Sequence, residues 1–161
     1  MPEVKRQRNA ERDDSGYSLL HRSWGWNVPV VDIDIVETAD GFVEDIWLEY
    51  DDGHPVCLVE VKSAKERPMH PKSRKAVSQL AQAAGIPAFI VRHDDPFVRF
   101  RVVPMNHEAI LWIDSARDMT EVEYVAFQYQ LRGREIPNEI VDRLRSCPAL
   151  SRIAEQRERA S

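Results

Sequence analysis

The segment Pro55–Lys62 constrains the fold of this chain more than any other stretch. Its centre is a short apolar run rich in β-branched side chains, and Asp51–Gly53 supplies a turn signal just before it. Such a run predicts a strand inside a sheet. Because side chains alternate along a strand, Glu60 and Lys62 share one face about 7 Å apart, while the intervening valine points the other way.

This pair of opposite charges has two interpretations. A carboxylate and an ammonium each lose several kcal/mol when they leave water, unless something compensates. They can compensate each other as a partly buried ion pair, and Glu-x-Lys is common enough to make this the simpler interpretation. Alternatively, Glu60 binds a metal ion and Lys62 lies beside a scissile phosphate. The choice between the two depends on the rest of the chain.

Length and composition indicate a soluble globular protein. The chain has 161 residues, of which 43% are hydrophobic and 30% charged. We expect a frayed tail at residues 1–14, a single domain at 15–146 and a charged C-terminal tail at 147–161. No apolar run approaches the roughly 18 residues of a membrane span, and the N-terminus lacks the apolar core of a signal peptide. We therefore expect no membrane partner, a cytoplasmic location, and free thiols at Cys57 and Cys147.

Charge is distributed unevenly along the chain, although the formal net charge is −5. Ten acids and no Lys or Arg lie between Asp32 and Glu60, whereas the segment from Lys62 to Lys75 carries six bases and one acid. A cation-binding site beside a phosphate-binding segment would look like this, and so would two solvated faces. Five bases are candidate phosphate contacts, with Arg92, Arg99 and Arg101 as outlying ones: Lys65, Arg67, Lys72, Arg74 and Lys75.

Periodicity and turn signals predict the order of the elements. The first three strands are spaced as an antiparallel meander, and the fourth is apolar on both faces, which indicates a central strand parallel to its neighbour. A helix between the third and fourth strands completes a βαβ unit. The predicted strands are 30–37, 42–50, 55–63, 86–92 and 97–104. The predicted helices are 15–22, 71–84, one that begins at Thr120 and ends at Gly133, and 137–146; residues 106–113 are left open as a loop with a short helix or an edge strand.

Four short motifs follow one another along residues 15–105: Trp-Asn-x-Pro at 26–29, Asp-Ile-Asp at 32–34, Pro-Val-x-Leu-x-Glu-x-Lys at 55–62 and Pro-Ala-Phe-x-Val at 87–91. In this order the chain resembles the restriction-endonuclease-like PD-(D/E)xK nucleases, and small phage and bacterial members in particular. The resemblance implies an α/β fold with a central mixed sheet in αβββαβ order flanked by helices, here followed by two C-terminal helices. It also implies Mg²⁺, with Mn²⁺ as a possible substitute, and a nucleic-acid partner, DNA being favoured over RNA.

Site residues carry over by position in the motifs. The resemblance implies that Asp34 and Glu60 bind the metal ion and that Lys62 is the catalytic lysine. The carbonyl of Val61 would be a third oxygen ligand. Gln79, on the helix after the third strand, takes the place where some relatives have a glutamine that faces the site. A divalent metal site for phosphodiester hydrolysis needs such hard oxygen ligands, and a nearby ammonium can offset the charge that grows on the phosphate.

The spacing leaves alternatives open for two of these residues. Twenty-five residues separate Asp34 from Glu60, a longer gap than these motifs usually have. Asp45, with a gap of fourteen residues, and Asp32 are therefore rivals. Asp34 is preferred because of the Trp-Asn-x-Pro motif upstream of it. On the helix, Gln82 competes with the glutamine named above.

The sequence thus predicts a metal-dependent nuclease that hydrolyses phosphodiester bonds. One alternative is a catalytically silent nucleic-acid-binding or assembly protein with the same fold. Another is an unrelated α+β interaction domain in which Glu60 and Lys62 are an ordinary ion pair. The chain shows no nucleotide-binding loop, so no nucleotide cofactor is expected, and a homodimer would suit an enzyme that cuts both strands of a duplex. If the protein is phage-encoded, its location is the host cytoplasm.

Overall fold

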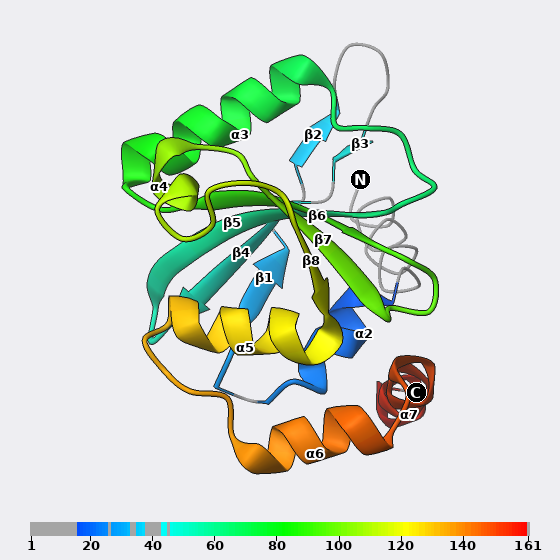
Figure 1. The fold of residues 1–161 in the computed structure, drawn as a ribbon. Coiled ribbons are helices and arrows are strands. Elements are labelled where there is room, and N and C mark those ends of the chain that lie inside the picture. The colour runs from blue at the N-terminus through cyan, green and yellow to red at the C-terminus, as the bar shows by residue number, and fades with distance from the viewer. Residues whose placement is uncertain (1–15, 26, 33–34, 38–42, 45, 161) are drawn as a thin grey trace. The chain divides into compact units, whose positions relative to one another are not determined.

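The computed structural model describes residues 16–25, 27–32, 35–37, 43–44 and 46–160 (Figure 1). The chain divides into two compact units, which are described separately. The larger unit spans residues 27–136, and the smaller one combines the N-terminal residues up to 26 with residues 137–161. No helix in the described part of the chain has the length and apolar character needed to cross a membrane.

The larger unit is a mixed α/β structure built on a six-stranded sheet in the order β1-β4-β5-β6-β7-β8. β5 and β6 run parallel, and every other neighbouring pair is antiparallel, so the predicted antiparallel meander and the strand–helix–strand crossover are both confirmed. The strands are β1 (Val30–Asp32), β4 (Ile46–Asp51), β5 (His54–Ser63), β6 (Ala88–His93), β7 (Arg99–Pro104) and β8 (Arg117–Thr120). The helices are α3 (Pro71–Ala84), α4 (His107–Ile110) and α5 (Glu121–Leu131).

Helix α3 covers one face of the sheet, as its sequence predicts. It opens with a proline, which suits the first helical turn, and it ends at Gly85, whose left-handed φ of 72° closes the helix. Before it, Nδ1 of His70 accepts a hydrogen bond from the backbone N–H of Lys72 at 3.2 Å. The apolar core between α3 and the sheet is drawn from β4, β5, β6, the loop before the helix and the helix itself: Ile46, Leu58, Met69, Val77, Ala81, Ala88 and Ile90.

Helix α5 lies on the opposite face of the sheet from α3 (Figure 1). The capping box expected at Thr120 is present: its hydroxyl accepts from the N–H of Glu123, and the Glu123 carboxylate accepts from the N–H of Thr120. Aromatic rings make this interface, with Phe100 stacked on Tyr124 at 4.8 Å between ring centroids. The side chains of β5 thus alternate between two buried faces, because the sheet is covered on both sides.

Several element boundaries differ from the predicted ones. Within the strand predicted at 30–37 the structure describes β1 and β2 (Ile35–Glu37), and within the one predicted at 42–50 it describes β3 (Val43–Glu44) and β4. β2 and β3 pair with each other. Both strand pairs follow one antiparallel register, with Asp32 opposite Trp47 and Ile35 opposite Glu44, so they agree with the predicted hairpin. Strand β8 is not among the predicted strands. In the segment 106–113, predicted as a loop with a short helix or as an edge strand, the structure has the short helix α4, capped by Asn106.

The smaller unit consists of α2 (Tyr17–Arg22), α6 (Asn138–Ser146) and α7 (Ala149–Ala160). Its core holds a fully buried tryptophan, Trp24, which meets the ring of Tyr17 edge-on at 5.8 Å between centroids. The C-terminal residues expected to form a charged tail are therefore a helix, and Arg152 on that helix is fully buried. Its guanidinium donates to the hydroxyl of Ser23 at 2.7 Å and to the carbonyl of Cys147 at 3.0 Å. Counting α5, three helices rather than two follow the sheet.

Candidate active site

Glu60 and Lys62 lie on one face of β5, as strand alternation predicts, and α3 covers this face. The carboxylate Oε1 and the ammonium Nζ are 3.5 Å apart, and the two side chains are 0% and 6% exposed. Ile46 on one neighbouring strand and Ile90 on the other pair with Glu60 in the sheet register. The strand is therefore central, and the Glu60 carboxylate lies between apolar residues of both neighbouring strands.

This setting makes the pair costly for stability. Two charges that leave water for an apolar interior recover the desolvation free energy only when their geometry is close and their remaining hydrogen-bonding groups are satisfied. A charge-assisted hydrogen bond between an ammonium and a carboxylate is usually about 2.7–2.9 Å long. The Glu60–Lys62 separation of 3.5 Å is longer, so this pair is a loose one.

The loop after β5 folds back over the end of the strand. We call residues 64–70 the strap. Lys62 Nζ donates to the carbonyl of Arg67 at 3.3 Å. Arg92, which pairs with Lys62 in the parallel register, donates to the carbonyl of Glu66 at 3.1 Å and to that of Arg67 at 3.2 Å. Met69 anchors the strap in the core beneath α3. The strap thus turns two carbonyls inward and leaves the side chains of those residues exposed.

The carboxylate predicted as the second metal ligand is the part of the site that the structure does not describe. Asp34 and its rival Asp45 lie outside the described residues. For Asp32 the backbone alone is described; it pairs with Trp47, one position along β4 from the residue that pairs with Glu60. Within the described residues, no three or more His, Cys, Asp or Glu side chains gather where they could hold a metal ion.

The oxygen donors in the described part of the site are nevertheless of the type that binds a divalent ion. Magnesium prefers hard oxygen ligands, often one or two carboxylates together with water and substrate phosphate oxygens. Glu60 supplies a carboxylate, and Val61 supplies a backbone carbonyl beside it, while the Val61 side chain is buried on the other face of β5. A second carboxylate from Asp34 would give the donor set that the resemblance implies.

Gln79 does not face the predicted site. The buried residues of α3 repeat every four positions, at Ser73, Val77 and Ala81, and this stripe contacts the sheet. Gln79 and its alternative Gln82 are both exposed. The helix turns position 79 toward solvent, so the structure does not bring Gln79 together with Glu60 and Lys62, and its site-facing role stays a prediction.

The five predicted phosphate contacts are all exposed, in the strap and on the first two turns of α3. Lys65 forms an ion pair with Asp95 at 3.8 Å, but both side chains are largely in solvent, where such a pair contributes about 0–1 kcal/mol. The first turn of α3 contains no acid. Cations are disfavoured at a helix N-terminus by the helix dipole, so helix stability does not explain the bases there: Lys72, Arg74 and Lys75.

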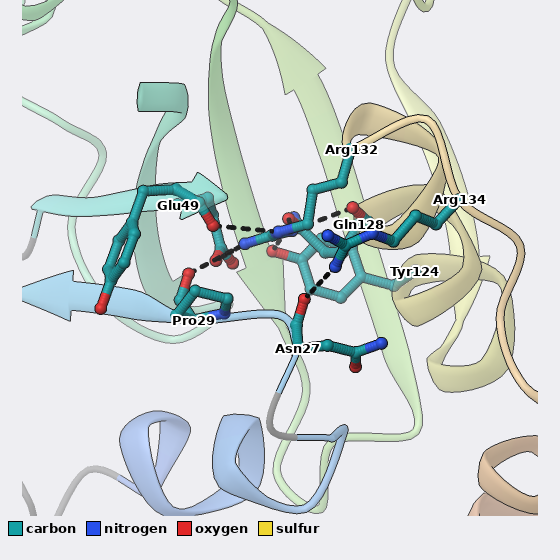
Figure 2. A network of polar contacts seen from close by, with 8 residues as sticks. Asn27, Pro29, Glu49, Tyr124, Gln128, Arg132 and Arg134 are labelled. Carbon is teal, nitrogen blue, oxygen red and sulfur yellow. Dashed lines mark hydrogen bonds and ion pairs between the residues drawn. The ribbon is translucent and has the colours of Figure 1, made fainter. Parts of the chain in front are cut away.

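A second buried polar network, which the sequence did not reveal, lies on the α5 face of the sheet (Figure 2). Arg132, at the end of α5, donates to the Glu49 carboxylate at 2.8 Å, and both side chains are 0% exposed. The other acceptors of its guanidinium are the carbonyls of Tyr50 and Pro29 and both the carbonyl and the side-chain oxygen of Gln128. All five N–H groups of Arg132 therefore have acceptors in the protein, and the network is a structural clamp between α5 and strands β1 and β4.

Cys57 lies beside this clamp, paired with Glu49 in the sheet register. Burial raises the pKa of the Cys57 thiol well above its ordinary value, and the Glu49 carboxylate raises it further, while Arg132 lowers it. The thiol stays protonated near neutral pH, which excludes it as a nucleophile, because the thiolate is the reactive form. Cys57 and Cys147 are both free, as predicted.

The row of side chains on β4 carries a signal that Glu49 is buried, although it does not indicate Arg132 as the partner. Glu49 shares its face with Trp47, and a tryptophan in a row of acids indicates that the row is covered.

No family model, curated protein or solved structure matches the chain. A function is therefore inferred from the chemistry of the chain's own residues.

Proposed function

We propose that this protein is a metal-dependent nuclease that hydrolyses phosphodiester bonds in nucleic acid, with DNA favoured over RNA. The observation that carries the proposal is the loose, buried Glu60–Lys62 pair on a central strand. A pair of well-packed apolar side chains would be at least as stable at such a position. A buried pair of opposite charges on a central strand is therefore a candidate for a functional site.

Comparison of the two buried ion pairs of the sheet supports this proposal. Arg132 and Glu49 are 2.8 Å apart, and every donor of the arginine is used by the protein, which is what a structural pair requires. Glu60 and Lys62 are 3.5 Å apart and lie at the end of β5 that leads into the basic strap. The first pair holds elements together, and the second is suited to chemistry on an anion.

Each residue of the site has a defined role in the proposed reaction. The Lys62 ammonium orients the attacking water and offsets the negative charge that develops on the phosphate oxygens. The Glu60 carboxylate, with the Val61 carbonyl and the predicted Asp34, holds Mg²⁺ or Mn²⁺. When bound, the ion acts as a Lewis acid and lowers the pKa of water. The exposed bases of the strap and α3 bind the backbone phosphates on either side of the scissile bond.

The restriction-endonuclease-like fold is part of the same proposal. Its support is the succession of β1, β4 and β5 in antiparallel order, then α3, then β6 parallel to β5, in a sheet covered by helices on both faces. This arrangement places the Glu-x-Lys motif on a strand with a neighbour on each side. Position 32 lies on β1, which pairs with β4, and the predicted ligand Asp34 is two positions further along the sequence.

Incubation of the purified protein with nucleic acids of different form tests the proposal. Linear, circular, single-stranded and branched DNA and an RNA would be offered with Mg²⁺ or Mn²⁺. We expect Lys62→Ala to lower the cleavage rate by about 10²–10³-fold, the usual effect of removing one group that stabilises transition-state charge. Arg117→Ala, which removes an exposed arginine from β8, is the matched control and should cleave like the wild type.

Two further measurements separate the alternatives. Circular dichroism at the assay temperature shows whether Lys62→Ala is folded, because this variant leaves Glu60 buried without the ammonium. Titration calorimetry with Mn²⁺ should show binding to the wild type that Glu60→Gln abolishes. Cleavage that persists in Lys62→Ala and without metal would come from a contaminant and refute the assignment. DNA binding without cleavage of any substrate would instead establish the catalytically silent alternative.

A further inference from the structure

Two cations on neighbouring parallel strands share one backbone oxygen. The carbonyl of Arg67 accepts from Lys62 Nζ at 3.3 Å and from Arg92 at 3.2 Å. The other terminal nitrogen of Arg92 donates to the preceding carbonyl, that of Glu66, at 3.1 Å. One guanidinium therefore grips two successive carbonyls of the strap, and the second of them is the acceptor of the catalytic ammonium.

These two hydrogen bonds of Arg92 help to fix the position of the Lys62 ammonium. The lysine side chain is a flexible four-carbon stem with a point charge at its end, whereas the guanidinium is a rigid planar fork. By holding the carbonyls of residues 66 and 67 together, Arg92 sets the direction of the Arg67 carbonyl. Lys62 is then held between that oxygen and Glu60 Oε1 at 3.5 Å.

We propose that Arg92 is a positioning residue that places the Lys62 ammonium through the strap carbonyls; this inference rests on the proposed nuclease function. Arg92 was expected to be an outlying phosphate contact. Both of its terminal nitrogens are instead engaged by the protein, and the side chain is only partly exposed. The strap is thus part of the catalytic machinery through its backbone and part of the phosphate-binding surface through its side chains.

Chemical labelling of lysine tests the positioning without any need for cleavage. Short pulses of acetic anhydride, with peptide mass spectrometry, give the acetylation rate of Lys62 relative to that of the exposed Lys72 and Lys75. We expect Arg92→Ala to raise the relative rate at Lys62 by about tenfold, the effect of losing one hydrogen bond to a charged group. Arg92→Lys, which can reach one carbonyl, should give an intermediate rate, and Arg117→Ala should match the wild type.

Kinetics then separate positioning from substrate contact. We expect Arg92→Ala to lower kcat by about 10²-fold with little change in KM, because misplacement of a catalytic group by about 1 Å has this effect. Arg67→Ala keeps the carbonyl and removes a phosphate contact, so its main effect should be a raised KM. If Arg92→Ala does not fold, Arg92→Lys serves for both measurements.

The outcomes are distinct. Unchanged labelling of Lys62 in Arg92→Ala overturns the inference, and so does labelling that rises equally at all three lysines, which would report general loosening. A change in KM alone also overturns it, because Arg92 would then contact the substrate. Raised labelling at Lys62 in a protein that cleaves nothing supports the positioning and refutes the nuclease function.

Discussion

Removal of the Arg132 side chain should destabilise this protein more than any change to a surface charge. Arg132→Ala leaves the Glu49 carboxylate fully buried beside a protonated thiol at Cys57. It also deprives the carbonyls of Pro29 and Tyr50 of the donor that the arginine provides. The variant therefore tests whether this network holds the larger unit together.

The magnitude follows from the burial of both partners. Loss of one partner of a fully buried ion pair costs about 3–5 kcal/mol, because the other charge remains uncompensated. This is a large part of the roughly 5–15 kcal/mol by which domains are stable. Arg134 provides a matched control two residues away. Its ion pair with Asp51 has a similar length, 2.9 Å, but the side chains are 41% and 24% exposed, so Arg134→Ala should cost only about 0.2–1 kcal/mol.

Urea denaturation followed by circular dichroism gives the free energy of unfolding for each variant. The double variant Glu49→Gln with Arg132→Met should lose less stability than Arg132→Ala alone, because it removes both charges and keeps much of the volume. The reasoning is refuted if Arg132→Ala costs no more than Arg134→Ala. It is also refuted if the double variant is the less stable one, since the buried carboxylate would then not be the source of the loss.

Two further predictions concern pH and salt. Because burial raises the pKa of Cys57, the folded thiol stays protonated at pH values where the unfolded thiol ionises. This contribution to the free energy of unfolding is complete below about pH 8.5 and is lost at up to about 1.4 kcal/mol per pH unit above it. Denaturant curves to about pH 10 should show this decline in the wild type and less of it in Cys57→Ala. For DNA binding, each Lys or Arg neutralised among the five candidate phosphate contacts should reduce the slope of log affinity against log salt concentration by about 1. Arg117→Ala should leave this slope unchanged. An unaltered slope in the variants of the five contacts would mean that DNA binds elsewhere on the protein.

Local signals in the sequence predicted the centre of the larger unit. The apolar run of β5, the proline and glycine that bound α3, and the capping box of α5 each depend on residues within a few positions of one another. Alternation along one strand also sufficed to put Glu60 and Lys62 on a common face. These features were predictable because local conformational preferences and the buried face agree there.

Features that join distant residues were not predictable in the same way. Arg132 and Glu49 are 83 positions apart, and nothing near either residue indicates its partner. The strap contact depends on backbone carbonyls, which every residue has, so the sequence shows Arg92 as a base without showing what it holds.

During synthesis the clamp can form only after Arg132 has left the ribosome. Its acceptors lie at residues 29, 49 and 50, while the arginine that joins them is at position 132, so contacts span 82 to 103 positions of the chain. Strands β1, β4 and β5 leave the ribosome long before α5 does. Until α5 emerges, one side of the nascent sheet exposes apolar rows and a carboxylate without its guanidinium. Nascent chains truncated before residue 132 should therefore be sensitive to proteases and should bind chaperones, and this sensitivity should fall once α5 has left the exit tunnel.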